Sequence, residues 1–333
     1  MNSNPAPWPP EVLEVVQRFI TCEYATLTGR GTPVTFPLTP YPGEDGRTID
    51  VSTGLSYPAK AERARRDPRV GILFSDPVGS HMEKPPVVLV YGLATVRDRD
   101  LQAGMDRYVR LNMAKFPDMY KGQFSFLLKR QQWYFTRIWM LTTPVKMLFW
   151  PDGDVQKQPE VWTAPEGTTA SPSDPAPTGP SAMPWNSSPG GWHEGAFEAL
   201  KNLGVPVLTV VDQASGGYPV PFRARTTSLT ESGFNLDMPA GMPIIPTGPA
   251  CLTFHSHPEV FVGMQNTAFV GEVSPRPDCG AFFTVERQLG DFSMGRTKLE
   301  TTLTFLRTGF RLNPQLKAEL ARRNQPMPEV RLP

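Results

Sequence analysis

One short stretch of this sequence carries side chains that could hold an anion. Ser52 and Thr53 end an apolar run, Gly54 makes a turn, and Pro58 and Lys60 open a short basic segment. Proline is tolerated in the first turn of a helix because the amides there have no partner within the helix. Those free N–H groups, the partial positive charge of the helix end, a lysine and two hydroxyls form a donor set suited to phosphate. The sequence therefore predicts a phosphate cradle at this turn.

A run of arginines follows the turn and offers a simpler interpretation. A charge run is usually a helix face in water, which would leave the basic residues without a ligand. The stretch that we align with the turn in the second half of the chain, residues 237–249, contains no Lys or Arg. One copy could thus bind phosphate while the other could not. The arginines concerned are Arg63, Arg65, Arg66 and Arg69.

The two halves of the chain show the same order of expected elements. Each opens with a short amphipathic helix and continues into a hairpin and further short strands. The matched stretches lie about 174 to 186 residues apart, which indicates an internal duplication. Few long helices and many short strands predict a mainly β protein with short helices, built as two small antiparallel barrels packed as a pseudo-dimer. The matches are 11–20 with 193–203, 25–36 with 207–222, 49–53 with 234–238, 72–77 with 252–258, and 87–96 with 261–273.

Proline marks the join between the halves. Nine of the 38 prolines fall between Pro151 and Gly191, among Ser, Thr, Gly and Ala. Such a segment has too few apolar residues to offset its ordering entropy, so we interpret it as a linker or a surface strap. The expected units are a barrel with the phosphate cradle at 1–150, the linker at 151–191 and a degenerate second barrel at 192–333.

Composition excludes several classes of protein. The 33 Lys and Arg against 32 Asp and Glu leave a net charge of +1, so no bulk field would gather nucleic acid or a membrane surface. The most apolar stretch, 85–96, is shorter than the ~20 residues that span a bilayer. The first ten residues lack the pattern of a signal peptide, which predicts a cytoplasmic protein. Cys22, Cys251 and Cys279 show no CxxC spacing and are expected to be buried thiols.

Other candidate positions have ordinary explanations. Residues 133–139 are aromatic at strand spacing and are expected in the core. His255 and His257 alternate, which would place both rings on one face of a strand. They could be half of a metal site or a haem ligand, but without a third ligand we favour a structural role and assign no metal; His81 is a lone loop histidine. No GxGxxG, Walker or GxSxG motif occurs.

The order of these stretches resembles the pyridoxamine 5′-phosphate oxidase-like split-barrel superfamily. The stretches that carry the resemblance are 25–28, 49–53, 60–70, 90–96 and the closing strands at 133–150. The resemblance covers about 20–150, and less closely 193–285. Members are six-stranded barrels that pair, with FMN or the deazaflavin F420 in the groove between the partners. At Pro58 this chain departs from the pattern, because many relatives have a basic residue there.

Carried over by position, the resemblance implies a cofactor site of eight residues. The phosphate would lie against Ser52, Thr53 and Lys60, with Arg65 or Arg66 as further ligands. The strand at Phe36, Pro37 and Leu38 would border the ring.

The resemblance implies a flavin- or deazaflavin-dependent oxidoreductase acting on a small organic substrate. FMN is the expected cofactor, F420 the alternative and haem the third option. The second half would replace the partner subunit, so that the two halves form an intrachain pseudo-dimer with one cofactor per chain. The chain itself would be a monomer or a homodimer. No catalytic residue is assigned because the cofactor supplies the chemistry. Two alternatives are a haem-binding split barrel that uses His81 or His255, and a binding module without turnover.

Overall fold

The structure is a computed structural model of the chain. It describes residues 8–121, 124–181, 187–188, 191–243, 245–259, 263–277, 280–290, 292–293 and 298–333. Within these ranges no helix is long and apolar enough to cross a membrane. Cys22 and Cys251 are buried free thiols, as expected, whereas Cys279 lies outside the described residues.

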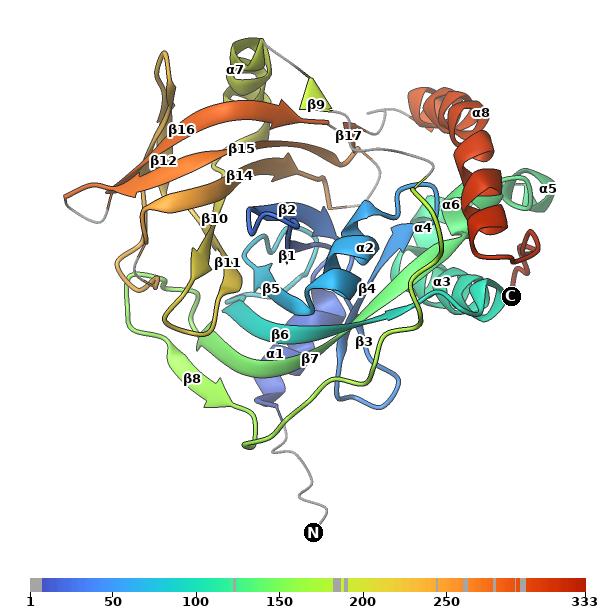
Figure 1. Cartoon of the computed structure of the whole chain (residues 1–333), viewed down its shortest axis with the longest axis horizontal. Helices are drawn as coiled ribbons and strands as arrows, with labels where there is room; N and C mark the ends of the chain where they lie inside the picture. The colour runs from blue at the N-terminus through green and yellow to red at the C-terminus, as the bar shows by residue number, and fades with distance from the viewer. Residues whose placement is uncertain are drawn as a thin grey trace.

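The first half builds one antiparallel sheet with the strand order β2-β1-β5-β6-β7-β4-β3, and β8 pairs with β7 (Figure 1). Its strands are β1 (Cys22–Leu27), β2 (Pro33–Leu38), β3 (Tyr41–Pro42), β4 (Ile49–Gly54), β5 (Arg69–Phe74), β6 (Val87–Arg97), β7 (Arg137–Trp150) and β8 (Glu160–Thr163). Its helices are α1 (Pro10–Arg18), α2 (Ala59–Arg66), α3 (Leu101–Lys115), α4 (Pro117–Tyr120), α5 (Ser125–Leu128) and α6 (Gln132–Phe135).

The second half repeats that order as β11-β10-β14-β15-β16-β13-β12, with β17 on β15 and β9 on β16. Its strands are β9 (Ser187–Ser188), β10 (Val207–Asp212), β11 (Tyr218–Arg223), β12 (Thr226–Leu229), β13 (Gly233–Asp237), β14 (Gly248–Ser256), β15 (Gln265–Pro275), β16 (Gly280–Leu289) and β17 (Phe292–Ser293). Its helices are α7 (Trp192–Leu203) and α8 (Lys298–Arg322).

The duplication extends to an irregularity of the central strands. A β-bulge falls between Tyr91 and Gly92 in the first sheet and between Val270 and Gly271 in the second. A side chain at Gly271 would place its Cβ 1.9 Å from the carbonyl oxygen of Thr284, so the bulge requires glycine. The prediction of a mainly β protein made of two split barrels is confirmed by this shared topology.

The halves pack through matching strands. β2 lies against β14 and β15 of the second half, and β11 lies against β5 and β6 of the first. At the centre of this contact Thr35 Oγ1 and Thr209 Oγ1 are 2.6 Å apart, and Thr253 Oγ1 donates to the Thr35 carbonyl over 3.1 Å. The reciprocal use of equivalent strands is the pattern of a two-fold interface, here formed within one chain.

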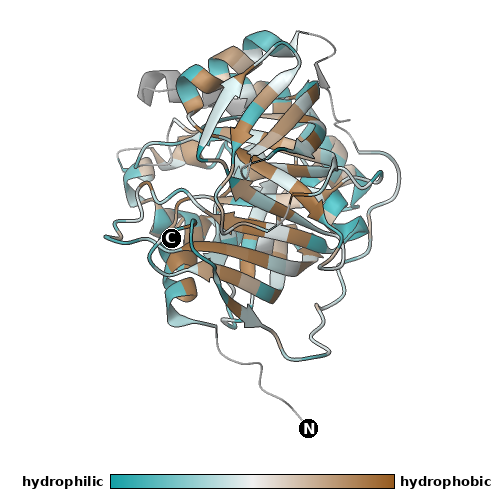
Figure 2. Cartoon of the chain, turned by 90° about the vertical axis from the view of Figure 1, so that its left-hand side faces the viewer, coloured by the Kyte–Doolittle hydropathy of each residue, from teal (hydrophilic) through white to brown (hydrophobic). Residues whose placement is uncertain are grey.

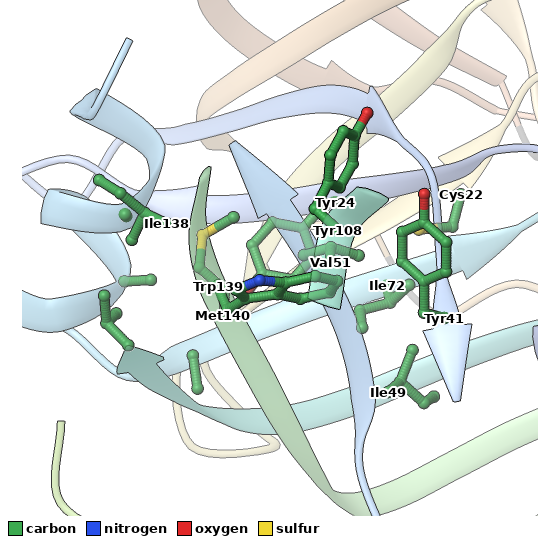
Figure 3. Packing of buried hydrophobic residues seen from close by; sticks show 14 of the residues in the cluster. Cys22, Tyr24, Tyr41, Ile49, Val51, Ile72, Tyr108, Ile138, Trp139 and Met140 are labelled. Atoms are coloured by element: carbon green, nitrogen blue, oxygen red, sulfur yellow. The ribbon is translucent and has the colours of Figure 1, made fainter. Parts of the chain in front are cut away.

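Apolar residues concentrate in the strands of both sheets (Figure 2). In the core of the first half, Tyr24, Tyr41, Tyr108 and Trp139 pack with the aliphatic residues of β4, β5 and β7 (Figure 3). The Tyr41 and Trp139 rings meet edge to face at 5.6 Å.

The prediction of strand spacing for the whole run from 133 to 139 is wrong. Trp133 to Phe135 lie in α6, which Thr136 ends by donating its hydroxyl hydrogen to the Gln132 carbonyl over 2.7 Å. β7 begins only at Arg137. All three aromatics are buried, so their expected place in the core is correct.

The proline-rich segment is a strap along the first half as far as residue 181. After β8, the Thr95 hydroxyl donates to the Ser171 carbonyl over 2.7 Å, and the Asp174 amide donates to the Val96 carbonyl over 2.9 Å. Hydrogen bonds to backbone carbonyls therefore attach the strap to β6. The unit boundaries at 150 and 192 stay a prediction.

The helix α8 returns from the second half to the first. Leu312, Leu316 and Leu320 belong to the first core, and Ser56 Oγ donates to the Leu312 carbonyl over 3.4 Å. The end of the chain therefore closes over the loop that leads from β4 to α2.

Candidate functional site

The predicted cradle lies where β4 ends and α2 begins. In the β4–β7 register Ser52 faces Trp139, Thr53 faces Ile138 and Gly54 faces Arg137. Both hydroxyl residues are buried. Thr53 Oγ1 donates to the Tyr57 carbonyl over 3.1 Å, which fixes the turn, whereas the Ser52 hydroxyl has no hydrogen-bond partner among the described residues.

Lys60 stands in the first turn of α2, where the sequence places it. Its ammonium lies 4.3 Å from the centroid of the Phe36 ring, a cation–π contact. It makes no hydrogen bond or ion pair with the residues that the structure describes. Burial, with the charges of Arg63 and Arg137, lowers the pKa of Lys60 to about 7.

Arg63 is not on a helix face in water. Its relative exposure is 7%, and its Nε donates to Thr26 Oγ1 over 2.9 Å. Burial lowers the pKa of Arg63 to about 10, so the group is still charged at neutral pH. The simpler interpretation of the arginine run fails at this position, because every third or fourth residue of a packed helix turns toward the sheet.

Arg137 belongs to the same site, and the sequence analysis did not single it out. Its Nη2 donates to the Tyr108 hydroxyl over 2.8 Å, and its guanidinium lies 4.2 Å from the Tyr108 ring and 4.6 Å from the Tyr134 ring. Its buried Nε has no partner among the described residues. The available signal was a lone arginine opening a long strand, but its position opposite Gly54 depends on a strand register that the sequence does not show.

These groups form a cluster of positive charge, which we call the cation cluster: Arg63, which is buried, and Lys60 and Arg137, which are half-buried. The interactions that shift the pKa of Lys60 are burial and two arginines, with no carboxylate among them. Burying a charge is costly unless an opposite charge compensates it. The cation cluster beside two hydroxyls therefore has the donor set and the charge that a phosphate group requires.

The two other candidate cations are held elsewhere. Arg65 Nη2 forms an ion pair with Asp98 over 2.7 Å, and the same guanidinium donates to the strap carbonyls of Asp174 and Pro175. Arg66 is exposed and reaches the Leu27 carbonyl over 3.5 Å. The structure thus leaves both outside the cation cluster.

The predicted ring-bordering strand lies at the boundary between the halves. Phe36 is buried and packs with Cys251, Val270 and Leu289 of the second half. Pro37 pairs with Glu23 of β1, and Leu38 is half-buried against the first core. Because Phe36 contacts both Lys60 and the second half, the cation cluster adjoins the contact between the two barrels.

The equivalent place in the second half is filled by the strap. The Gly241 amide donates to the Val155 carbonyl over 3.0 Å, and a Cβ at Gly241 would lie 2.0 Å from the Lys157 carbonyl oxygen. Trp150 donates its indole N–H to the same oxygen over 2.8 Å and packs on the Phe222 ring. The backbone of the strap therefore stands where a ligand would have to approach.

The histidines that could serve haem or a metal are otherwise engaged. His255 Nε2 lies 2.8 Å from Glu23 Oε1, and His257 Nε2 lies 2.9 Å from Thr21 Oγ1, both buried. Both rings approach the Asp76 carboxylate, at 3.9 and 3.6 Å, so they share one side as predicted. His81 lies in a loop with φ of 53°. Within the described ranges no group of three or more His, Cys, Asp or Glu could hold a metal.

No protein-family model matches the chain, and no curated protein does. Solved structures do match. A putative pyridoxamine 5′-phosphate oxidase from Listeria innocua is 18% identical with a TM-score of 0.29, over 42% of this chain and 96% of that one. An F420 reductase is 20% identical with a TM-score of 0.29, over 41% and 94%.

The haem storage protein HutZ from Vibrio cholerae is also similar. It is 14% identical with a TM-score of 0.29, over 46% of this chain and 93% of that one. Less than half of this chain thus matches each of these three proteins nearly end to end. At such TM-scores we draw no functional argument from them, and the fold rests on the strand pairing described above.

Proposed function

We propose that the chain binds the phosphate of an isoalloxazine-type cofactor, FMN or F420, and is an oxidoreductase for a small organic substrate. The observation that carries the proposal is the cation cluster, in which the half-buried Lys60 has no anionic partner among the residues that the structure describes. A folded protein keeps such a group only where a ligand or a tight constraint compensates it.

The fit of a phosphate to this site follows from the atoms present. Lys60 and Arg137 would supply charged donors, the Ser52 hydroxyl a neutral one, and Gly54 leaves the turn open between Tyr57 and Arg137. The Tyr108 and Tyr134 rings hold the guanidinium of Arg137 from one side. A donor set fixed before the ligand arrives loses little entropy on binding.

A bound flavin or deazaflavin supplies the hydride-transfer chemistry itself. The part of this chain is to bind and orient it and to exclude water. Phe36 contributes an apolar surface that reaches from Lys60 to the second half. Because the strap fills the equivalent place in the second half, we propose one cofactor per chain.

The test is to identify whatever small molecule accompanies the purified protein, by mass spectrometry and a visible spectrum. Titration of the stripped protein with FMN, F420 and haem follows. The proposal expects saturable binding of FMN or F420 that is competed by inorganic phosphate. A Soret band with no flavin binding would support the haem alternative instead. Cofactor binding without turnover with any reductant would support the alternative of a storage or sensing module that has no catalytic activity.

A further inference from the structure

A second charged cluster lies between the halves, away from the cation cluster. It gathers at the ends of β1, β5, β11 and β14 and just beyond them. We call it the dyad cluster, and its members are Glu23, Ser75, Asp76, Arg223, His255 and His257.

Arg223 and Glu23 form its centre. Arg223 Nη2 donates to Glu23 Oε1 over 2.6 Å, and Arg223 Nε donates to Ser75 Oγ over 2.8 Å. Ser75 in turn donates to Glu23 Oε1 over 2.8 Å. Although burial raises the pKa of Glu23, Arg223 and His255 lower it to about 2, so the carboxylate is charged.

The histidines extend the cluster to a second carboxylate. His255 Nε2 lies 2.8 Å from Glu23 Oε1 and 2.9 Å from Arg223 Nη2. Its Nδ1 is 3.9 Å from Asp76 Oδ2, and His257 Nε2 is 3.6 Å from the same oxygen. The side chains of Glu23 and His255 are almost completely buried.

The acidic and the basic side chains of the dyad cluster come from different halves. Both carboxylates, Glu23 and Asp76, come from the first half. The basic groups, Arg223, His255 and His257, come from the second. Each buried charge thus has its partner across the contact between the halves.

The internal symmetry shows what this division prevents. Strand pairing sets Glu23 opposite Leu73 in the first half and Leu208 opposite Leu252 in the second. Overlaying these pairs makes Glu23 equivalent to Leu208 and Leu73 equivalent to Leu252. Asp76 and His255, each three residues further along the chain, are then equivalent as well.

The same overlay makes Arg223 equivalent to Leu38, because these residues pair with Val207 and Cys22. Asp76 and His255, as equivalent positions that approach each other within 3.9 Å, therefore lie near the pseudo-two-fold axis. A residue near a two-fold axis meets its own copy in a symmetric pair.

The apolar part of the contact does not make this distinction. Val34 and Phe36 of β2 face the second half, and their equivalents in β11, Pro219 and Pro221, lie against Gly71 of the first. Apolar packing alone would accept two first halves, or two second halves, from different chains. With like halves paired, Asp76 would face Asp76 and His255 would face His255, and Glu23 and Arg223 would be buried without each other.

We propose that the dyad cluster is a recognition element through which each half of the chain selects the unlike half as its partner. The ion pairs stabilise the contact between a first half and a second half, and uncompensated like charges would destabilise a contact between two first halves or two second halves. The proposal does not depend on the cofactor and stands on the contact between the halves alone.

The test is a double-mutant cycle on the full chain, with thermal unfolding as the measurement. We expect Glu23→Gln and Arg223→Gln each to lower the unfolding midpoint by at least about 5 °C, and the double variant to lose no more than the worse single variant. A single variant that fails to fold while the double variant folds gives the same support. Additive losses would overturn the proposal.

The matched control is the exposed pair Arg225 and Asp237, 3.6 Å apart and on the second half alone. Arg225→Gln with Asp237→Asn should show coupling near zero. A second arm exchanges the charges near the axis. Asp76→His and His255→Asp should each destabilise, and the combined exchange should recover at least half of the larger loss. A combined variant that is worse than both singles would contradict recognition by charge.

Discussion

The two halves share one strand order but surround equivalent turns with opposite chemistry. In the first half the turn after β4 leads into a helix and gathers the cation cluster. In the second half the turn after β13 forms no helix among its described residues and is filled by the backbone of the strap at Val155 and Lys157. The same strand order therefore accommodates a turn with the cation cluster and a turn without it.

The first prediction, with the largest effect, removes one cation from the first half. Lys60→Met should weaken binding of FMN or F420 by about 1.5–3 kcal/mol, because a charged hydrogen bond to phosphate is lost. The same change should raise the unfolding midpoint of the ligand-free protein. A lysine whose folded pKa is lowered to about 7 binds fewer protons than the unfolded chain between about pH 7 and pH 10.5.

In that pH window the free energy of unfolding rises with pH, because the lysine gives up its proton more readily in the folded protein. Below the window Lys60 is charged in both states, and the folded protein bears the full free-energy cost of burying that charge. Calorimetry for affinity and thermal unfolding for stability test the two effects. Lys115 offers a matched control, because it is also a half-buried lysine with a pKa of about 7, but its Nζ donates to the Pro40 carbonyl. Lys115→Met should leave cofactor affinity unchanged. Equal loss of affinity in both variants would show that Lys60 does not bind the cofactor phosphate.

The second prediction compares the two turns through their glycines. Gly241→Ala should cost about 1–3 kcal/mol of stability, because its Cβ would lie 2.0 Å from the Lys157 oxygen. Gly54→Ala should cost no more than about 0.5 kcal/mol, because its nearest contacts, at 3.6 and 3.7 Å, are ordinary. Urea unfolding measures both. If Gly241→Ala were the milder change, the strap would not fill the second turn.

The third prediction concerns pH. Affinity for inorganic phosphate should decrease by up to about tenfold per pH unit above about pH 7, where Lys60 loses its proton in the free protein. It should also decrease at the acid end of the range, where the phosphate dianion takes up a proton. Phosphate titrations of Lys60→Met from pH 5.5 to 9 should show a smaller decrease of affinity above about pH 7. An unchanged alkaline limb would mean that another group titrates.

The fourth prediction, with the smallest effect, separates the arginines of α2. Arg66→Gln should change cofactor affinity by less than about twofold, because the exposed side chain lies outside the cation cluster. Arg63→Gln, its buried neighbour on the same helix, is the comparison and should weaken binding clearly. Equal effects would return Arg66 to the phosphate site.

The sequence predicted the parts of this account that depend on local pattern. Alternating apolar residues and glycine turns indicated the order of strands along the chain that the two halves share. Pro58 indicated a helix start nearby, and α2 begins at Ala59. The missing basic residues of 237–249 indicated the difference between the turns.

What the sequence did not show depends on contacts between distant residues. Arg137 joins the cation cluster through the pairing of β7 with β4, whereas Arg65 lies outside the cluster, where Asp98 and the strap bind it. The sequence analysis missed the helix at 132–135 because four residues are too few to show a helical period of apolar residues.

The measurement that tests the central claim most directly is the stoichiometry of cofactor binding by isothermal titration, on the stripped chain and on Lys60→Met. The account predicts one FMN or F420 per chain, with binding strongly weakened in the variant. Two equivalent sites per chain, or affinity that Lys60→Met leaves intact, would contradict it.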